Sequence, residues 1–258
     1  MNISRLMDVP KNWRTIQKGE GQVFEEAKIT LKLPKDEIGK SYSNAQIDDY
    51  PNLKRRDFLN EAPLKFKIKA RLKCEEEPKG TFGFGFWNDP FLMTEPRMPS
   101  LPKAIWFFGS SSESSMDLAI GLPGHGWKMG CIDAWSWKFL LLIPTIPFSV
   151  PLMWIPFIRR KLWPIAQKFM KCSEALVPVS VKDWHEYEID WQTNLVTFYI
   201  DNQKQFEAPA PKGKLGLVIW IDNQYMKIDP RAKMSCGNLH LKHEQSLEIE
   251  SFELINHG

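Results

Sequence analysis

Alternation of apolar and polar residues is the clearest pattern in this chain. In the segment 63–73, "PLKFKIKARLK", apolar residues occupy every second position from Leu64 and basic residues lie between them. Successive side chains of a strand point to opposite faces, so this segment predicts a half-buried antiparallel strand. Residues 75–80, "EEEPKG", predict a polar turn. Residues 81–87, "TFGFGFW", predict the returning strand, whose glycines permit a close approach of backbone.

Further strands are predicted at 104–109, 115–120, 184–191, 195–201, 214–222 and 246–255. The short polar turn "QTN" separates the strands at 184–191 and 195–201. No long amphipathic helix interrupts these segments. Many strands joined by short turns predict an all-β jelly-roll β-sandwich of two antiparallel sheets, built as one domain over 1–258.

One region departs from this pattern. Residues 139–158, "FLLLIPTIPFSVPLMWIPFI", carry no charge, and the basic segment 159–172 follows them. A run of this length is long enough to span a bilayer as a helix. A proline inside a helix costs about 3 kcal/mol, however, and this run contains several: Pro144, Pro147, Pro151 and Pro156. We therefore predict short apolar pieces that do not cross a membrane, within a partly helical insertion over 137–175.

The apolar run must be covered, because a monomer rarely exposes so large a patch to water. Three ways of shielding this apolar run from water are compatible with the sequence. The insertion folds over a cleft as a lid, meets its copy in a homodimer through 139–171, or makes a peripheral contact with a membrane. The basic residues Arg159, Arg160 and Lys161 fit an interfacial helix on anionic lipid, and they equally fit a solvated helix face.

Composition narrows the possible classes of function. The chain has 258 residues, 43% hydrophobic and 25% charged, with a net charge of +3. This is a globular protein whose charge is too mild to predict a nucleic-acid partner. The cysteines have no zinc-like spacing, and we predict reduced thiols: Cys74, Cys131, Cys172 and Cys236. No secretory signal is visible at the N-terminus, so we expect a cytoplasmic protein.

The most specific motif is "DWHEYEIDWQTNLVTFYIDNQ" at 183–203. It resembles the segment H-x-Y-x-(I/L)-x-W, followed by (I/V)-x-F-Y-(I/V)-D-(G/N), of the glycoside hydrolase family 16 proteins. The matching residues are His185, Tyr187, Ile189, Trp191, Val196, Phe198, Tyr199, Ile200, Asp201 and Asn202. The resemblance continues in "KGTFGFGFWNDP", in "KLGLVIWIDNQY" and in "LEIESFELI", where Glu250 stands in place of the family's usual Asp. It implies the concanavalin A-like jelly roll, with a cleft on its concave face.

The family's chemistry rests on a strand of the form E-x-D-x-(x)-E. One Glu is the nucleophile and the other the acid/base, and retention requires the two carboxyl groups about 5 Å apart. The stretch that we align with this strand is 115–120, "SMDLAI". There Ser115 replaces the nucleophile, Ile120 (or Ala119, with a bulge) replaces the acid/base, and Asp117 remains. We therefore expect no glycosidase activity.

Other residues of this cleft can still act on a ligand. Asp117 is the candidate general acid, because an apolar cleft would raise its pKa; the alternative is a structural carboxylate. Tryptophans in the cleft would stack on sugars, polyenes or carbocations, or belong to the core. The candidate ligand-binding residues are Trp87, Trp106, His125, Trp127, Asp133, Trp135 and Trp220. No metal-ligand cluster and no nucleotide-binding loop is present in the sequence, so we predict no cofactor.

Three functions fit these features. The first is a non-hydrolytic enzyme, of cyclase or isomerase type, that acts on an apolar or amphiphilic small molecule. The second is a lectin-like carbohydrate-binding protein that kept the cleft and lost catalysis. The third is a protein that binds a membrane surface through the insertion. The fold alone does not decide among them.

Overall fold

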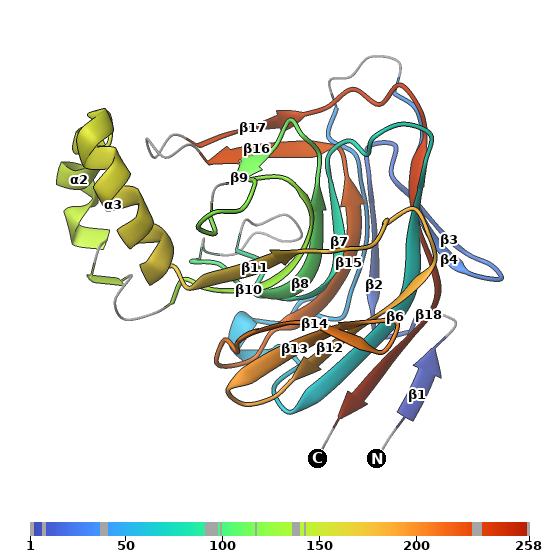
Figure 1. Cartoon of the computed structure of the whole chain (residues 1–258). Helices are drawn as coiled ribbons and strands as arrows, with labels where there is room; N and C mark the ends of the chain where they lie inside the picture. Colours follow the sequence, from blue (N-terminus) through green and yellow to red (C-terminus); the bar gives the residue numbers. More distant parts are fainter. Residues whose placement is uncertain are drawn as a thin grey trace.

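A computed structural model describes residues 3–6, 9–36, 41–90, 98, 100–116, 118–135, 140–141, 143–228 and 234–256. Most of these residues form two stacked antiparallel sheets, which curve together so that one of them is concave (Figure 1). The predicted all-β jelly-roll sandwich is confirmed.

We call the two layers the back sheet and the cleft sheet. The back sheet has the strand order β14 (Gln203–Pro209), β13 (Leu195–Ile200), β12 (His185–Trp191), β6 (Leu64–Cys74), β18 (Gln245–Asn256), β4 (Ile29–Leu33) and β3 (Gln22–Glu25), with β1 (Ile3–Leu6) also paired to β18. The cleft sheet has the order β11 (Cys172–Leu176), β10 (Gly126–Asp133), β8 (Lys103–Ser110), β7 (Thr81–Trp87), β15 (Gly216–Asp222), β5 (Asn44–Asp48) and β2 (Arg14–Lys18).

The core fills the space between the two sheets. β7 contributes Phe82, Phe84 and Phe86 from its alternate positions, and β6 contributes Phe66 and Ile68, all of them buried. The opposite face of β6 carries its basic residues, which pair with carboxylates of the neighbouring strands. These ion pairs are Lys65–Glu188, Lys67–Glu188, Lys69–Glu250 and Arg71–Glu248, at 2.7–2.9 Å. The alternating pattern of 63–73 therefore separates the core from a charged outer surface, as predicted.

A small third sheet stands at the rim of the concave face. It has the order β17 (Met234–Asn238), β16 (Gln224–Ile228) and β9 (Ser115–Met116), and β9 runs parallel to β16. The prediction of a longer strand over 115–120 is wrong. After Met116 the described residues 118–120 leave the sheet, and Ile120 is 63% exposed. Hydrophobicity alone did not distinguish this rim segment from a strand of the main sheet.

The insertion leaves the cleft sheet after β10 and returns as β11, which pairs directly with β10. Its described part contains the 3₁₀ helix η2 (Ile143–Thr145), α2 (Ile146–Leu152) and α3 (Pro156–Phe169). The two α-helices stand beside the open end of the concave face (Figure 1). Among the described residues, no helix combines the length and the apolar character that crossing a membrane requires. A further 3₁₀ helix, η1 (Arg55–Asp57), follows β5.

Candidate functional site

Four aromatic rings form the floor of the concave face. They come from alternate positions of three adjacent strands: Trp87 on β7, Trp106 and Phe108 on β8, and Trp220 on β15. The rings of Trp87 and Trp220 are stacked, with centroids 6.2 Å apart and planes within 3°. Trp106 lies 5.9 Å from Trp220 and 4.9 Å from Phe108. The floor is therefore one continuous aromatic surface.

Glycines on β7 make room for these rings. Gly83 lies in register between Phe108 and Trp220, and a Cβ atom there would come within 2.9 Å of the Trp220 ring. Gly85 lies beside Trp106, where a Cβ atom would come within 2.7 Å of the Trp106 Cα. The pattern "TFGFGFW" thus reflects the different requirements of the two faces of β7. Phenylalanines fill the core, and glycines let tryptophans lie flat over the opposite face.

The insertion and the small sheet border this floor. Together they form a cavity of about 650 Å³. Its wall on the insertion side consists of residues from α2, α3 and the turns that follow them: Ser149, Val150, Met153, Leu162, Trp163, Ile165, Ala166 and Met170. Its wall on the other side comes from β9, β16 and β17: Met116, Gln224, Tyr225, Met226, Ile228 and Met234. A volume of this size suits a small molecule.

A few polar groups lie among these apolar walls. Asp222, at the end of β15, is buried and lines the cavity. Its Oδ1 accepts hydrogen bonds from the Thr81 hydroxyl (2.9 Å) and from the backbone N–H of Gln224 (3.0 Å). Burial outweighs these bonds and raises the pKa of Asp222 to about 7. This carboxyl group is therefore partly protonated at neutral pH.

A buried ion pair lies where the insertion joins the sheet. The Lys128 ammonium group on β10 is 3.1 Å from the Glu174 carboxylate on β11. Both side chains are buried and both line the cavity. Since β10 and β11 flank the insertion, this pair joins its two ends at the cavity wall.

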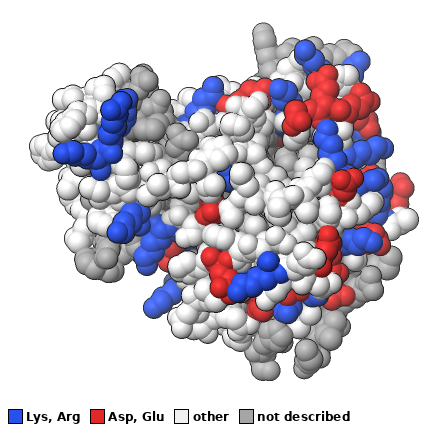
Figure 2. Space-filling view, viewed as in Figure 1, with Lys and Arg blue, Asp and Glu red and all other residues white. Residues whose placement is uncertain are grey.

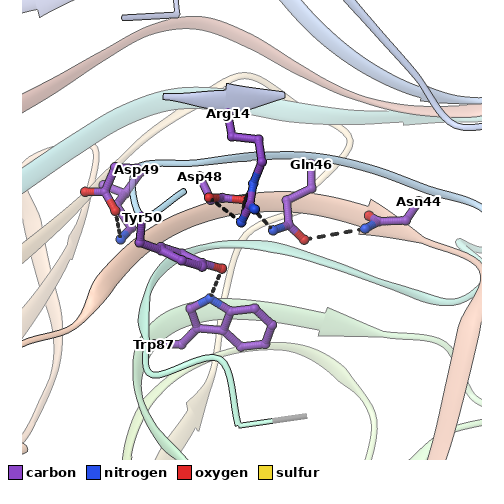
Figure 3. Close-up of polar contacts among 8 residues, drawn as sticks. Arg14, Asn44, Gln46, Asp48, Asp49, Tyr50 and Trp87 are labelled. Carbon is purple, nitrogen blue, oxygen red and sulfur yellow. Dashed lines mark hydrogen bonds and ion pairs between the residues drawn. The ribbon is translucent and has the colours of Figure 1, made fainter. Parts of the chain in front are cut away.

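Hydrogen bonds among side chains on β2, on β5 and just after it, and on β7 support the edge of the floor that is remote from the insertion (Figure 3). Arg14 pairs with the buried Asp48 at 2.9 Å, and the amide of Gln46 donates to Asp48 at 3.0 Å. Burial raises the pKa of Asp48, while Arg14 and Gln46 oppose that rise. The Trp87 indole N–H donates to the Tyr50 hydroxyl at 2.6 Å. These bonds fix the orientation of Gln46 and Trp87, which both line the cavity.

The predicted tryptophans separate into three groups. Trp87, Trp106 and Trp220 line the cavity together. Trp127 lies on the core face of β10, where its ring stacks on Phe82 with centroids 5.4 Å apart. Trp135 is half exposed outside the cavity, and its indole N–H donates to the Leu101 carbonyl at 3.0 Å.

The predicted polar candidates lie away from the cavity or outside the described residues. His125 is exposed in the loop before β10. Asp133 is half-buried, 3.9 Å from the Lys103 ammonium group. Neither residue lines the cavity. Asp117, the candidate general acid, lies outside the described residues. In the part of the chain that the structure describes, no cluster of His, Cys, Asp or Glu is arranged to hold a metal ion.

Sequence reasoning missed Asp222, Phe108 and Gln46, which all line the cavity. The signal for Asp222 was present. It lies two residues after Trp220 in a predicted strand, and such positions share a face. Phe108 follows the same rule from Trp106. Gln46 carried no signal, because its strand was not predicted.

Among the described residues of the cleft sheet, Asp48 and Asp222 are too far apart to act as the pair that a retaining glycosidase requires. Among the described strands of the cleft sheet, β5, β11 and β15 each present one cleft-facing carboxylate: Asp48, Glu174 and Asp222. Asp48 lies opposite Val218, four residues from Asp222 along β15. That separation is about 13 Å along the strand, against about 5 Å for retention.

The strand that pairs with β7 on the side of the insertion is β8, and its cleft-facing positions include Ala104, Trp106 and Phe108. In the stretch 115–120, which the sequence aligns with the family's catalytic strand, Ser115 and Met116 pair with β16 at the rim, and the described residues 118–120 lie outside the sheets. The expected replacement of glutamates by Ser115 and Ile120 therefore has no counterpart in the cleft sheet.

This fold and cleft define a concanavalin A-like jelly-roll protein, the architecture shared by glycosidases and lectins. The family model of the glycosyl hydrolases family 16 matches residues 171–230, from the end of the insertion through β16. This match includes the motif at 183–203 and confirms the resemblance. No curated protein matches the chain by sequence.

Solved structures share the fold over nearly the whole chain. One, from work on endo-acting O-glycanases of the human gut microbiota that initiate mucin breakdown, is 10% identical, covers 97% of this chain and 95% of its own, and has a TM-score of 0.52. The Crh5 transglycosylase is 11% identical, with coverage of 99% and 85% and a TM-score of 0.51. A legume lectin-like domain from Entamoeba histolytica is 12% identical, with coverage of 96% and 91% and a TM-score of 0.50. At these identities the likeness concerns the fold alone.

Proposed function

We propose that this protein binds an apolar or amphiphilic small molecule in the concave cavity and converts it without hydrolysis, by cyclisation or isomerisation. The observation that carries the proposal is the cavity itself. Its floor is aromatic, and a helical insertion forms one of its walls. An extended polysaccharide needs a long polar groove, whereas a concave cavity with mostly apolar walls suits a compact apolar or amphiphilic ligand.

The residues of the cavity can contribute to such a reaction in two ways. The walls hold a flexible substrate in one reactive conformation, which removes much of the entropic barrier. The faces of Trp87, Trp106 and Trp220 stabilise a developing carbocation by about 0.5–2 kcal/mol each. Neither contribution requires a pair of carboxylates.

Asp222 is the candidate proton donor among the described residues. A pKa of about 7 leaves a proton available near neutral pH, and a positioned general acid contributes roughly 10²- to 10⁴-fold in rate. The backbone N–H of Gln224 and the Thr81 hydroxyl stabilise the carboxylate that remains after transfer. Asp117 stays a candidate for the same role.

Ligand binding is tested with an amphiphilic fluorescent probe, anilinonaphthalene sulfonate, titrated into the whole protein. We expect Trp106→Leu to weaken binding about tenfold, since that ring lies on the cavity floor. The matched control is Trp184→Leu, because Trp184 contacts Arg71 on the back sheet, away from the cavity. Equal affinity in the wild type and both variants would place the probe elsewhere and overturn the proposed site.

A lectin-like function is the second candidate, because aromatic floors also stack on sugar rings. A glycan array with the whole protein separates the two. Selective binding of an oligosaccharide, lost in Trp106→Leu, together with no binding of the apolar probe, would replace the first proposal with the second.

A further inference from the structure

The insertion has a second apolar surface that does not face the cavity. On α2, Val150 lines the cavity, whereas Phe148 is 78% exposed. On α3, Leu162 and Ala166 line the cavity, whereas Phe157 is 68% exposed. The exposed apolar residues gather on α2, on the turn between the helices and at the start of α3: Phe148, Leu152, Trp154, Ile155 and Phe157. We call these five residues the outer apolar patch.

The charge around this patch has one sign. Residues 137–171 contain no Asp and no Glu. Arg160 and Lys161 are exposed on α3, three and four residues after Phe157, and therefore neighbour it on one helix face. The exposed Lys168 lies on the same face about three turns further along the helix. The Lys161 ammonium group lies 4.6 Å from the Phe157 ring centroid. Figure 2 shows basic but no acidic atoms on the helical lobe at the left, whereas both signs mix over the sandwich.

We propose that the outer face of α2 and α3 docks on an anionic phospholipid surface. The outer apolar patch enters the boundary between headgroups and acyl chains, and Arg160, Lys161 and Lys168 contact lipid phosphates. α3 has 14 residues, about 21 Å of helix, which is too short to span the hydrocarbon core. The contact is therefore peripheral.

A second copy of the chain fits this surface less well. A two-fold dimer would set each patch and its basic rim against the same residues of the partner. Like charges would then face one another with no carboxylate from 137–171 to offset them. An anionic membrane supplies both the apolar phase and the opposite charge.

This inference rests on the proposed function and extends it. The helices that carry the outer apolar patch also form one wall of the cavity. Docking would place that wall against the lipid phase, where apolar and amphiphilic molecules concentrate. The ligand would then be a molecule that partitions into membranes.

Vesicle flotation of the whole protein tests the docking without any ligand. We expect flotation with phosphatidylcholine vesicles that contain phosphatidylglycerol, much less with phosphatidylcholine alone, and release at high salt. The double substitution Arg160→Gln and Lys161→Gln should lower the partition coefficient roughly 30-fold. Phe157→Ser should lower it about tenfold or more.

Two matched variants control for charge and hydrophobicity. Lys212→Gln with Lys214→Gln removes the same charge from an exposed loop of the sandwich, and Phe24→Ser removes a half-exposed phenylalanine from β3. Both should float like the wild type. Binding of anilinonaphthalene sulfonate by all variants checks the cavity separately, so failure of the cavity proposal is distinguishable from failure of docking.

Three results would overturn the inference. One is no flotation of the wild type with anionic vesicles. Another is flotation that the substitutions on α3 leave unchanged. The third is a concentration-dependent dimer, seen by analytical ultracentrifugation, that Phe157→Ser abolishes in a protein that does not float; the patch would then be an interface between copies.

Discussion

Asp222 should make the protein less stable at neutral pH than at acidic pH. Burial raises the pKa of its carboxyl group from 3.8 to about 7 in the folded protein. Between these values the folded state keeps a proton that the unfolded state releases. Stability therefore falls as the pH rises from about 4 to 7, and levels off above 7. The full difference corresponds to about 4 kcal/mol.

The substitution Asp222→Asn removes this dependence. The amide oxygen can still accept hydrogen bonds from the Thr81 hydroxyl and the Gln224 backbone N–H, and the side chain no longer titrates. We expect the variant to match the wild type near pH 4 and to exceed its free energy of unfolding by about 4 kcal/mol at pH 8. Asp49, whose pKa burial also raises to about 7, is present in both proteins, so the comparison cancels its contribution.

Urea unfolding followed by tryptophan fluorescence, at several pH values between 4.5 and 8, measures this difference. The control is Asp57→Asn, which replaces an exposed carboxylate outside the cavity and reports any general effect of an Asp→Asn substitution. A constant difference between wild type and Asp222→Asn across the range would show that the carboxyl group titrates normally. The argument for Asp222 as a proton donor would then fail.

Three further predictions concern the cavity walls. Glu174→Leu or Lys128→Met alone should lower the free energy of unfolding by about 3–5 kcal/mol, and the double variant should recover most of it in a double-mutant cycle; additive losses would contradict a buried pair. Gly85→Ala should cost roughly 1–3 kcal/mol, because its Cβ would lie 2.3 Å from the Ile105 carbonyl oxygen; an unchanged melting temperature would show that β7 can shift. Replacing 139–171 by a Gly/Ser linker should leave the sandwich folded by circular dichroism and abolish binding of the probe; retained binding would mean that the helices are not needed as a wall.

The sequence predicted the strands whose pattern is either strictly alternating or apolar and aromatic. β6, which has one buried face and one charged face, was located nearly to the residue, and so was β7, which is buried on both faces by phenylalanines and by glycines and Trp87. β5 and β10 were missed because polar residues on their cleft face interrupt the apolar pattern. Gln46 on β5 and Lys128 on β10 lie inside the protein with partners on other strands, and such partners are not visible in a local pattern.

The candidate site was predictable in part. Trp87, Trp106 and Trp220 followed from position within predicted strands. Trp127 was misplaced because β10 was not recognised as a strand, so its side of the sheet could not be assigned. The sequence did not decide whether the apolar run contacts the cleft, a second copy of the chain or a membrane. A sequence shows that a segment is apolar, but it does not show what packs against that segment. The structure places its inner face at the cavity.

The path of the insertion has a consequence for how the cavity can change. Its two ends are held by neighbouring strands, with Ile132 on β10 opposite Cys172 on β11, about 5 Å apart. Because both ends of the insertion leave the sandwich at the same place, the insertion can differ in length or in tilt without any change to the hydrogen bonds of the two sheets. Related chains can therefore acquire cavities of different volume through changes in this one segment. Ligand size can evolve independently of the stability of the fold.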